Sequence, residues 1–543
     1  MQANHTHAHS HHHGHDHRRH PKSTDPVNEV HPRANKKIQA VVGRTTAKQA
    51  LPAIVSHIFK RPPEPTWKVS LSIATRVSRA GIATANERFE KTKPQDHDEL
   101  IEQVRECRFI DPASSCTTDE IRGGTVLFRN IRVKKRPQDG ILKEAAERET
   151  GDRILRGEWC VAEWLLDPAG PPPRPQVLLH LHGGAHVVQD LESYRNYNAN
   201  VSMMSRCRVY AIDYRLAPEA VFPDSLLDAM NAYYYLTEDL GVPPSDIILS
   251  GDSAGGTIAV QLMMYLRDHG FAQVGGAILL SPWLDLSTSF NSWEENENKD
   301  FLTIGKTNEA LHPPRLYVSD AWPPDADSML RFQEMVVHPY VSPALAPAEQ
   351  LRSFPPILIH SGGCERLRDD ATVFTRRARL ADENNMVGHQ LWVDGVHVFA
   401  SVQETRAGAS AQKEVGKWLQ TMCDRRPATG SPEATWAKEI DAEVTRERRG
   451  RISRAGKIPP FPKASRKWRY EGKLEQLPDI GVKPDGYKPA FAAAAEANSA
   501  EGMNGVTEVF RPYKMGRQER HQRDKEMREM QNKSSGNPYR DEQ

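Results

Sequence analysis

The chain has little net charge and few cysteines, and both shortages narrow the classes of protein to which it can belong. Its 543 residues include 72 lysines and arginines against 71 aspartates and glutamates, a formal net charge of +1. This balance gives no indication of a nucleic-acid partner or an acidic substrate. The six cysteines are scattered and form no Cys-x-x-Cys pair: Cys107, Cys116, Cys160, Cys207, Cys364 and Cys423. They predict neither a zinc site nor a disulfide framework, and they favour an intracellular, cytoplasmic compartment.

Long apolar runs are also absent. No segment approaches the roughly 18 consecutive apolar residues of a membrane-spanning helix, and the His-rich start of the sequence lacks the apolar core of a secretory signal. Residues 66–85 are amphipathic with interspersed cations, a pattern typical of a helix that lies on a membrane surface or packs on the body of a protein. We expect packing, with peripheral membrane contact as the open alternative.

The apolar residues that are present, 38% of the chain, are unevenly distributed. Residues 1–36 contain almost nothing apolar and crowd nine histidines into positions 5–20, and we expect a disordered tail without a specific metal site. Residues 37–120 have a helical, amphipathic pattern, and residues 121–424 contain the strand-like core. Residues 425–543 are dense in charge and proline, so we expect a mostly disordered extension, with a docking arm for partners as the alternative.

Eight runs within the core have the pattern of strands. They are roughly residues 124–133, 158–166, 176–181, 207–213, 246–250, 276–281, 356–361 and 389–394. The short, continuous apolar runs among them are typical of parallel strands covered on both faces. Helix-like stretches separate several of the later strands, which predicts an α/β fold with a mostly parallel, eight-stranded sheet and helices on both faces. The long gap between the sixth and seventh strands predicts an insertion at residues 283–350.

Residues 251–255, Gly-Asp-Ser-Ala-Gly, follow an apolar run and precede a helix-like stretch. Strand, Gly-x-Ser-x-Gly and helix in this order predict a nucleophile elbow, a strained turn that exposes the hydroxyl of Ser253. Glycines are required beside it because a Cβ there would collide with the neighbouring strand or helix. The sequence therefore predicts Ser253 as a catalytic nucleophile.

A serine hydroxyl needs a base within hydrogen-bond reach, and the base needs an orienting acid. In this architecture both follow the serine in the order acid, then histidine. Glu365 is the first carboxylate after the seventh strand, with Asp369 one helical turn later, and His397 follows the last strand. We expect Ser253, Glu365 and His397 to form a catalytic triad, with Asp369 as the alternative acid.

Residues 182–186, His-Gly-Gly-Ala-His, come directly after the third strand. A glycine pair lets the backbone approach a substrate and present N–H groups to a tetrahedral oxyanion, where each donor contributes roughly 3–4 kcal/mol. We expect Gly183, Gly184, Ala185 and, from the elbow, Ala254 to supply these donors. His182 is expected to hold the loop by hydrogen bonding rather than to act in catalysis.

Together these motifs resemble the hormone-sensitive-lipase-like branch of the α/β-hydrolases. The resemblance rests on His-Gly-Gly at 182–184, Asp-Tyr-Arg-Leu-Ala-Pro-Glu at 213–219, Gly-Asp-Ser-Ala-Gly-Gly at 251–256, Ser-Pro-Trp-Leu-Asp at 281–285 and His-x-Phe at 397–399. It covers roughly residues 120–420. It implies hydrolysis of small hydrophobic carboxylic esters without a cofactor, and a cap built from the N-terminal helices and from residues 283–350.

Two departures from the family pattern bear on the site. The third glycine of the family's His-Gly-Gly-Gly is Ala185 here, and the Cβ of this residue narrows the pocket beside the oxyanion, which predicts an altered acyl preference. The family's acidic motif usually begins with aspartate, whereas this chain has Glu365, which is longer by one methylene. The main hypothesis is a serine carboxylesterase. An amidase or acyltransferase on the same fold, and a non-catalytic ligand-binding receptor, are the alternatives.

Overall fold

The computed structural model describes residues 48–59, 62–64, 67–108, 121, 123–166, 173–304, 309–319, 321–401, 405–425, 434–455, 472–475 and 507–512. The His-rich tail that we expect at residues 1–36 lies outside these residues, as does most of the extension after residue 424. Residues 48–59 are helical.

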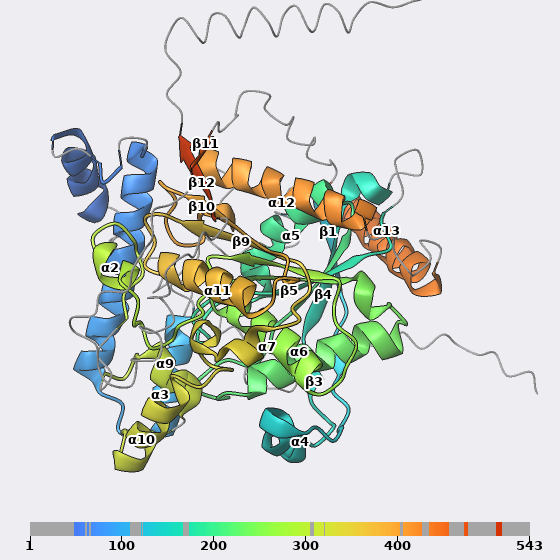
Figure 1. Cartoon of the computed structure of the whole chain (residues 1–543), viewed down its shortest axis with the longest axis horizontal. Coiled ribbons are helices and arrows are strands. Elements are labelled where there is room, and N and C mark those ends of the chain that lie inside the picture. The colour runs from blue at the N-terminus through green and yellow to red at the C-terminus, as the bar shows by residue number, and fades with distance from the viewer. Residues whose placement is uncertain are drawn as a thin grey trace, which may run out of the picture.

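A mixed sheet forms the centre of the molecule (Figure 1). Its strands are β1 (Gly124–Phe128), β4 (Gly157–Ala162), β5 (Val177–Leu181), β6 (Arg208–Ile212), β7 (Ile247–Asp252), β8 (Gly276–Leu280), β9 (Ile357–Gly362), β10 (Val387–Trp392), β11 (Gly472–Glu475) and β12 (Thr507–Pro512). Their order is β1-β4-β6-β5-β7-β8-β9-β10-β12-β11. β2 (Ile131–Arg132) and β3 (Ile154–Leu155) form a separate pair.

The eight predicted strands correspond to β1 and β4–β10, so the predicted fold is confirmed. Every neighbouring pair from β6 to β12 is parallel, whereas β1–β4, β4–β6 and β11–β12 are antiparallel. β5–β9 are buried along their whole length, as expected of parallel strands covered on both faces. Since the carboxyl ends of parallel strands meet at one edge, the loops after β5, β7, β9 and β10 come together there.

Helices cover both faces of the sheet. They are α2 (Val69–Thr92), α3 (His97–Cys107), α4 (Lys143–Arg148), α5 (Leu191–Ser205), α6 (Asp224–Tyr234), α7 (Ala254–Asp268), α8 (Ser292–Glu295), α9 (Pro313–Val318), α10 (Ala326–Met335), α11 (Arg368–Ala381), α12 (Arg406–Arg425) and α13 (Thr435–Ala455). The buried side chains of α5 and α12 share one hydrophobic cluster, and those of α6, α7 and α11 belong to a larger one. None of the described helices is long and apolar enough to cross a membrane.

Part of the extension after residue 424 is ordered and packs on the sheet. α13 buries Trp436, which stacks on Trp159 with ring centroids 6.0 Å apart. Asp441 of the same helix accepts a hydrogen bond of 2.6 Å from the buried guanidinium of Arg208. β12 pairs with β10, and β11 pairs with β12, so the extension also adds two strands to the sheet edge. The expected disorder of the remaining residues lies outside the described part of the chain.

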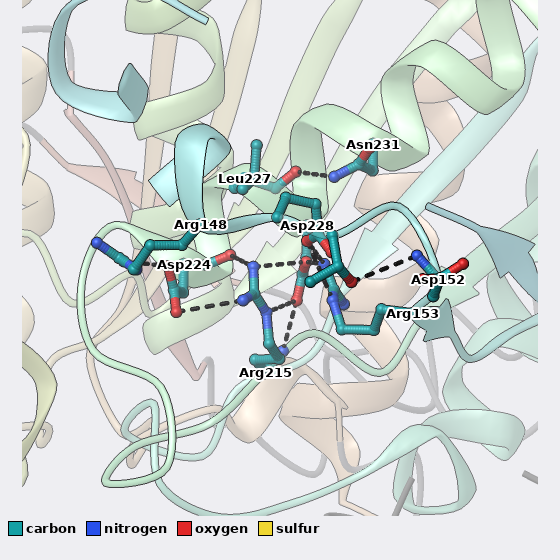
Figure 2. A network of polar contacts seen from close by, with 10 residues as sticks. Arg148, Asp152, Arg153, Arg215, Asp224, Leu227, Asp228 and Asn231 are labelled. Carbon is teal, nitrogen blue, oxygen red and sulfur yellow. Dashed lines mark hydrogen bonds and ion pairs between the residues drawn. The ribbon is translucent and has the colours of Figure 1, made fainter. Parts of the chain in front are cut away.

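A buried ion network fixes the loop after β6 to α6 (Figure 2). Asp228 is fully buried and receives hydrogen bonds from Arg215 (3.0 Å) and Arg153 (2.6 Å). Burial alone raises the pKa of an aspartate, but the two guanidinium charges outweigh it and hold the pKa of Asp228 below its ordinary value. Arg215 also contacts Asp224 on the same helix. Since Arg153 directly precedes β3, the network also ties the β2–β3 pair to α6.

The N-terminal helices α2 and α3 form a layer with the segment between β8 and β9. A third hydrophobic cluster joins them to this segment and to the loops after β5 and β6: Ala85, Phe89, Leu100, Val104, Val187, Ala217, Ala310 and Leu316. The indole N–H of Trp322 donates to the carbonyl of Pro94 at 2.7 Å. The boundaries of a two-part cap at residues 37–120 and 283–350 stay a prediction, as does the domain limit at residue 424.

Candidate active site

Ser253 stands between β7 and α7 with a backbone φ of +50°. This left-handed conformation is strained for a residue with a side chain. A Cβ on Gly251 would lie 2.5 Å from the carbonyl oxygen of Gly255, and a Cβ on Gly255 would lie 2.0 Å from that of Leu181. The flanking glycines are therefore required by close backbone approach, as the sequence predicts for an elbow.

His397 lies beside this hydroxyl. Its Nε2 is 3.1 Å from Oγ of Ser253, a hydrogen-bond distance. The loop after β10 that carries it is fixed by the N–H of Val398, which donates to Oγ of Ser281 at 3.0 Å. Burial lowers the pKa of His397 to about 4, because an imidazolium without water around it is poorly solvated. The neutral imidazole is thus the resting form at neutral pH.

Glu365 lies on the other side of the imidazole. Its Oε2 is 3.4 Å from Nδ1 of His397, and its Oε1 accepts the N–H of Gly362 at 3.0 Å. The carboxyl group has no exposed surface. Burial raises the pKa of Glu365 to about 8, although hydrogen bonds from Ser281 and the backbone oppose this.

Asp369, the alternative acid, is engaged elsewhere. Its carboxylate pairs with Arg368 at 2.8 Å and accepts the N–H of Ser292 at 2.9 Å. The second contact ties the start of α11 to α8. The structure therefore brings Glu365, and not Asp369, to the imidazole of His397.

The loop after β5 approaches the elbow from the side of β5. Gly184 has φ +112°, and a Cβ there would lie 2.0 Å from the carbonyl oxygen of Val188. Ala185 has φ +55°, a left-handed conformation that costs an alanine roughly 1–2 kcal/mol. Ala254 is the first residue of α7, so its N–H is not used as a donor within that helix.

Gly183 differs from the other expected donors. Its N–H donates to Oδ1 of Asp252 at 3.0 Å and to the hydroxyl of Tyr194 at 3.1 Å. The same hydroxyl donates to the other carboxylate oxygen of Asp252 at 2.8 Å. The N–H of Gly183 is thus already hydrogen bonded and ties the loop to the elbow, which leaves Gly184, Ala185 and Ala254 as the expected donors to an oxyanion.

His182 is buried and stacks on Tyr214 with ring centroids 4.3 Å apart. Its Nδ1 lies 2.7 Å from the carbonyl oxygen of Gly183, and its backbone carbonyl accepts a hydrogen bond of 2.6 Å from the hydroxyl of Tyr214. These contacts are those of a residue that holds the loop.

Asp300 is a buried carboxylate near His397 that the motifs do not identify. Its Oδ2 accepts the N–H of Arg366 at 2.7 Å, and its Oδ1 lies 3.4 Å from the backbone nitrogen of His397, whose N–H points at it. Burial raises the pKa of Asp300, and the charge of His397 opposes the rise. In turn, Asp300 is the charge that raises the pKa of His397 against the larger effect of burial. It lies in an irregular segment, where a lone aspartate gives no sequence signal.

The N-terminal helices are clamped to both sides of this site. The guanidinium of Arg79 on α2 donates to the backbone carbonyls of Glu297 and Asp300. Arg108, at the end of α3, donates to the carbonyl of Val187 at 2.7 Å and forms a two-pronged ion pair with Glu219. The first contact lies beside Asp300 and the second beside the loop of Gly184.

No cluster of His, Cys, Asp and Glu side chains suited to a metal ion occurs among the residues that the structure describes. The histidines of residues 1–36 lie outside them.

The chain is similar to known hydrolases. A family described as alpha/beta hydrolase fold matches residues 178–401. The chain is 32% identical over 249 residues to an acetyl-hydrolase of Streptomyces hygroscopicus, covering 46% of this chain and 75% of the relative. It is 28% identical over 151 residues to hormone-sensitive lipase of Mus musculus, covering 27% and 20%. An esterase structure from the bacterial hormone-sensitive lipase family matches with a TM-score of 0.45 at 25% identity, covering 64% of this chain and 98% of that one.

Proposed function

We propose that this chain cleaves carboxylic esters through an acyl-enzyme formed on Ser253. The chain belongs to the α/β-hydrolase family, and it is an esterase- and lipase-like hydrolase of the hormone-sensitive-lipase branch of that family. The observation that carries the proposal is the 3.1 Å separation of Oγ of Ser253 and Nε2 of His397 at the elbow. His397 is the general base and acid, and Glu365 orients it.

The reaction proceeds in two halves. Oγ of Ser253 attacks the ester carbonyl carbon while its proton passes to Nε2 of His397, giving a tetrahedral intermediate. The intermediate collapses as His397 returns that proton to the leaving alcohol, and the acyl group remains on Ser253. Water then attacks the acyl-enzyme while His397 takes its proton, and the carboxylic acid leaves as His397 returns that proton to Oγ of Ser253.

The oxyanion of each intermediate needs backbone donors. We assign this role to the N–H groups of Gly184, Ala185 and Ala254, since Gly183 already donates to Asp252. Glu365 holds Nδ1–H of His397 so that Nε2 faces the serine, and Asp300 places a negative charge next to the imidazolium.

Amide hydrolysis and acyl transfer use the same elbow, so the reaction type is tested by product analysis. The wild-type chain is incubated with p-nitrophenyl acetate and butyrate, with the matching anilides, and with an added alcohol as acyl acceptor. Release of p-nitrophenol and free acid from the esters supports the proposal. Faster cleavage of the anilides, or transfer of most of the acyl group to the alcohol, would support the alternatives.

Ala185→Gly is expected to change acyl preference. Removing the Cβ widens the pocket beside the oxyanion and relieves the left-handed strain, so kcat/KM for longer or branched acyl chains rises relative to acetate by about tenfold, the scale of one methyl group in a pocket. The measurement is kcat/KM over a graded series of p-nitrophenyl esters, with Tm followed as a control for folding. An unchanged ratio across the series would exclude Ala185 as a determinant of acyl size.

The acidic limb of the pH–rate profile is expected below the ordinary pKa of histidine. The base acts only when neutral, and burial lowers the pKa of His397 to about 4, so activity is retained into mildly acidic pH.

Asp300 raises the pKa of His397, so Asp300→Asn is expected to move the acidic limb to lower pH. The variant also lowers kcat about tenfold, because the imidazolium loses a stabilising charge. Asp369→Asn is the matched control, and it leaves the limb in place. If Asp300→Asn leaves the acidic limb at the wild-type pH, the role of Asp300 is structural only.

A further inference from the structure

Residues 48–59 form a helix that presents an apolar stripe to the outside. Leu51, Val55, Ile58 and Phe59 are all exposed, Leu51 to 67% and Phe59 to 79%. Their spacing of four, three and one residues places them on one face of the helix. Four large apolar side chains on one helix face form a contiguous hydrophobic patch, which marks an interaction site more often than single exposed residues do.

The opposite face of the helix is already packed. Ala53 is buried, Nδ1 of His57 lies 2.7 Å from the hydroxyl of Ser72, and Arg76 donates to the carbonyl of Pro52 at 3.1 Å. These contacts fix the helix against α2. Figure 1 shows it in dark blue at the outer edge of the molecule, beside the first turns of α2 and away from α13. The stripe therefore faces away from the enzyme body.

The sequence on either side of this helix carries almost only positive charge. In a chain whose net charge is only +1, residues 30–86 contain ten lysines and arginines and one acidic residue, Glu64. Lys48 on the helix and Arg76 beside it are exposed. A purely apolar partner, such as a second copy of this helix, would bring these cations together, whereas an anionic lipid surface neutralises them.

We propose that helix 48–59 docks on an anionic lipid surface, lying in the plane of the interface with Leu51, Val55, Ile58 and Phe59 inserted among the acyl chains and the cations at the headgroups. An apolar face flanked by lysine and arginine is the pattern of interfacial helices. The proposal concerns the location of the enzyme and does not depend on the chemistry at Ser253. It also moves the membrane contact away from residues 66–85, since Trp67, Thr75 and Ala85 of that segment are buried against the body.

The test is co-sedimentation of the full-length chain with vesicles of phosphatidylcholine alone and of phosphatidylcholine containing phosphatidylserine. The wild type is expected to bind the anionic vesicles and to be released by added salt, since surface charge attraction is screened. Ile58→Ser with Phe59→Ser is expected to lower the partition coefficient by about tenfold or more. Turnover of p-nitrophenyl acetate should stay unchanged, because neither residue lies at the active site.

Leu380→Ser is the matched control, since Leu380 on α11 is 62% exposed but lies outside the basic segment. It is expected to leave vesicle binding as in the wild type. Absence of binding by the wild type overturns the proposal, as does equal binding to neutral and anionic vesicles. If the wild type without vesicles sediments as a dimer and the double variant as a monomer, the stripe binds a second copy of the chain. This result would also overturn the proposal.

Discussion

Ser253→Ala is expected to lower kcat for p-nitrophenyl esters by about a million-fold, the loss seen when a serine hydrolase is deprived of its nucleophile. The variant keeps a side chain at φ +50°, so the backbone strain of the elbow and the helix that follows it are preserved. The effect is therefore chemical, because no other hydroxyl stands at 3.1 Å from Nε2 of His397 in the described structure. The measurement is single-turnover hydrolysis of p-nitrophenyl butyrate, with circular dichroism to show that the variant is folded.

The same experiment includes His397→Ala and the double variant. Residues that act as one unit give non-additive losses, so the double variant should be no slower than either single variant. Additive losses would mean that Ser253 and His397 act separately. A Ser253→Ala protein with most of its activity intact would contradict the proposed role of this serine.

Asp228→Asn is expected to destabilise the protein by about 3 kcal/mol, the range for removing one partner of a buried ion pair. The carboxylate is fully buried and accepts hydrogen bonds from Arg215 and Arg153 (Figure 2), so the variant leaves two guanidinium groups without their shared counter-charge. Urea unfolding of the two proteins gives the difference directly.

Asp152→Asn is the control. Asp152 pairs with Arg132 at 3.4 Å, but both side chains are mostly exposed, so its loss should cost less than about 1 kcal/mol. The pH dependence separates the two further. Because the pKa of Asp228 is lowered by folding, its contribution is present above the pKa of an unfolded aspartate and is lost as pH falls through the folded value. Equal destabilisation by both variants, or a difference that does not shrink in acid, would contradict this account of the network.

The strands and the loops of the proposed active site were predictable because each carries a local signal. The continuous apolar run of β5 indicates a strand that is buried on both faces. The Gly-x-Ser-x-Gly motif indicates a turn in which the backbone approaches neighbouring segments closely. The order of Glu365 and His397 along the chain follows from the parallel sheet, so their positions were predicted without knowledge of their contacts. Their 3.4 Å separation agrees with that expectation and supports the proposed triad.

Other features depend on contacts between distant parts of the chain. α13 has a narrow buried face in a strongly charged sequence, and only the docking of Trp436 on Trp159 identifies it as part of the body. The engagement of Gly183 depends on Asp252, sixty-nine residues later. Asp300 reaches His397 across ninety-seven residues from an irregular segment. The periodicity of apolar residues along the sequence does not predict such pairings, because they arise from tertiary packing.

The central claim is an acyl-enzyme on Ser253, and acid-quenched peptide mass spectrometry tests it most directly. The wild-type chain is mixed with p-nitrophenyl butyrate and, in parallel, with a fluorophosphonate that leaves a stable adduct on activated serines. The account predicts a butyryl group and a phosphonyl group on the peptide that contains Ser253, and neither on the Ser253→Ala protein. Ester turnover with no adduct on that peptide, or with the adduct on another residue, would contradict it.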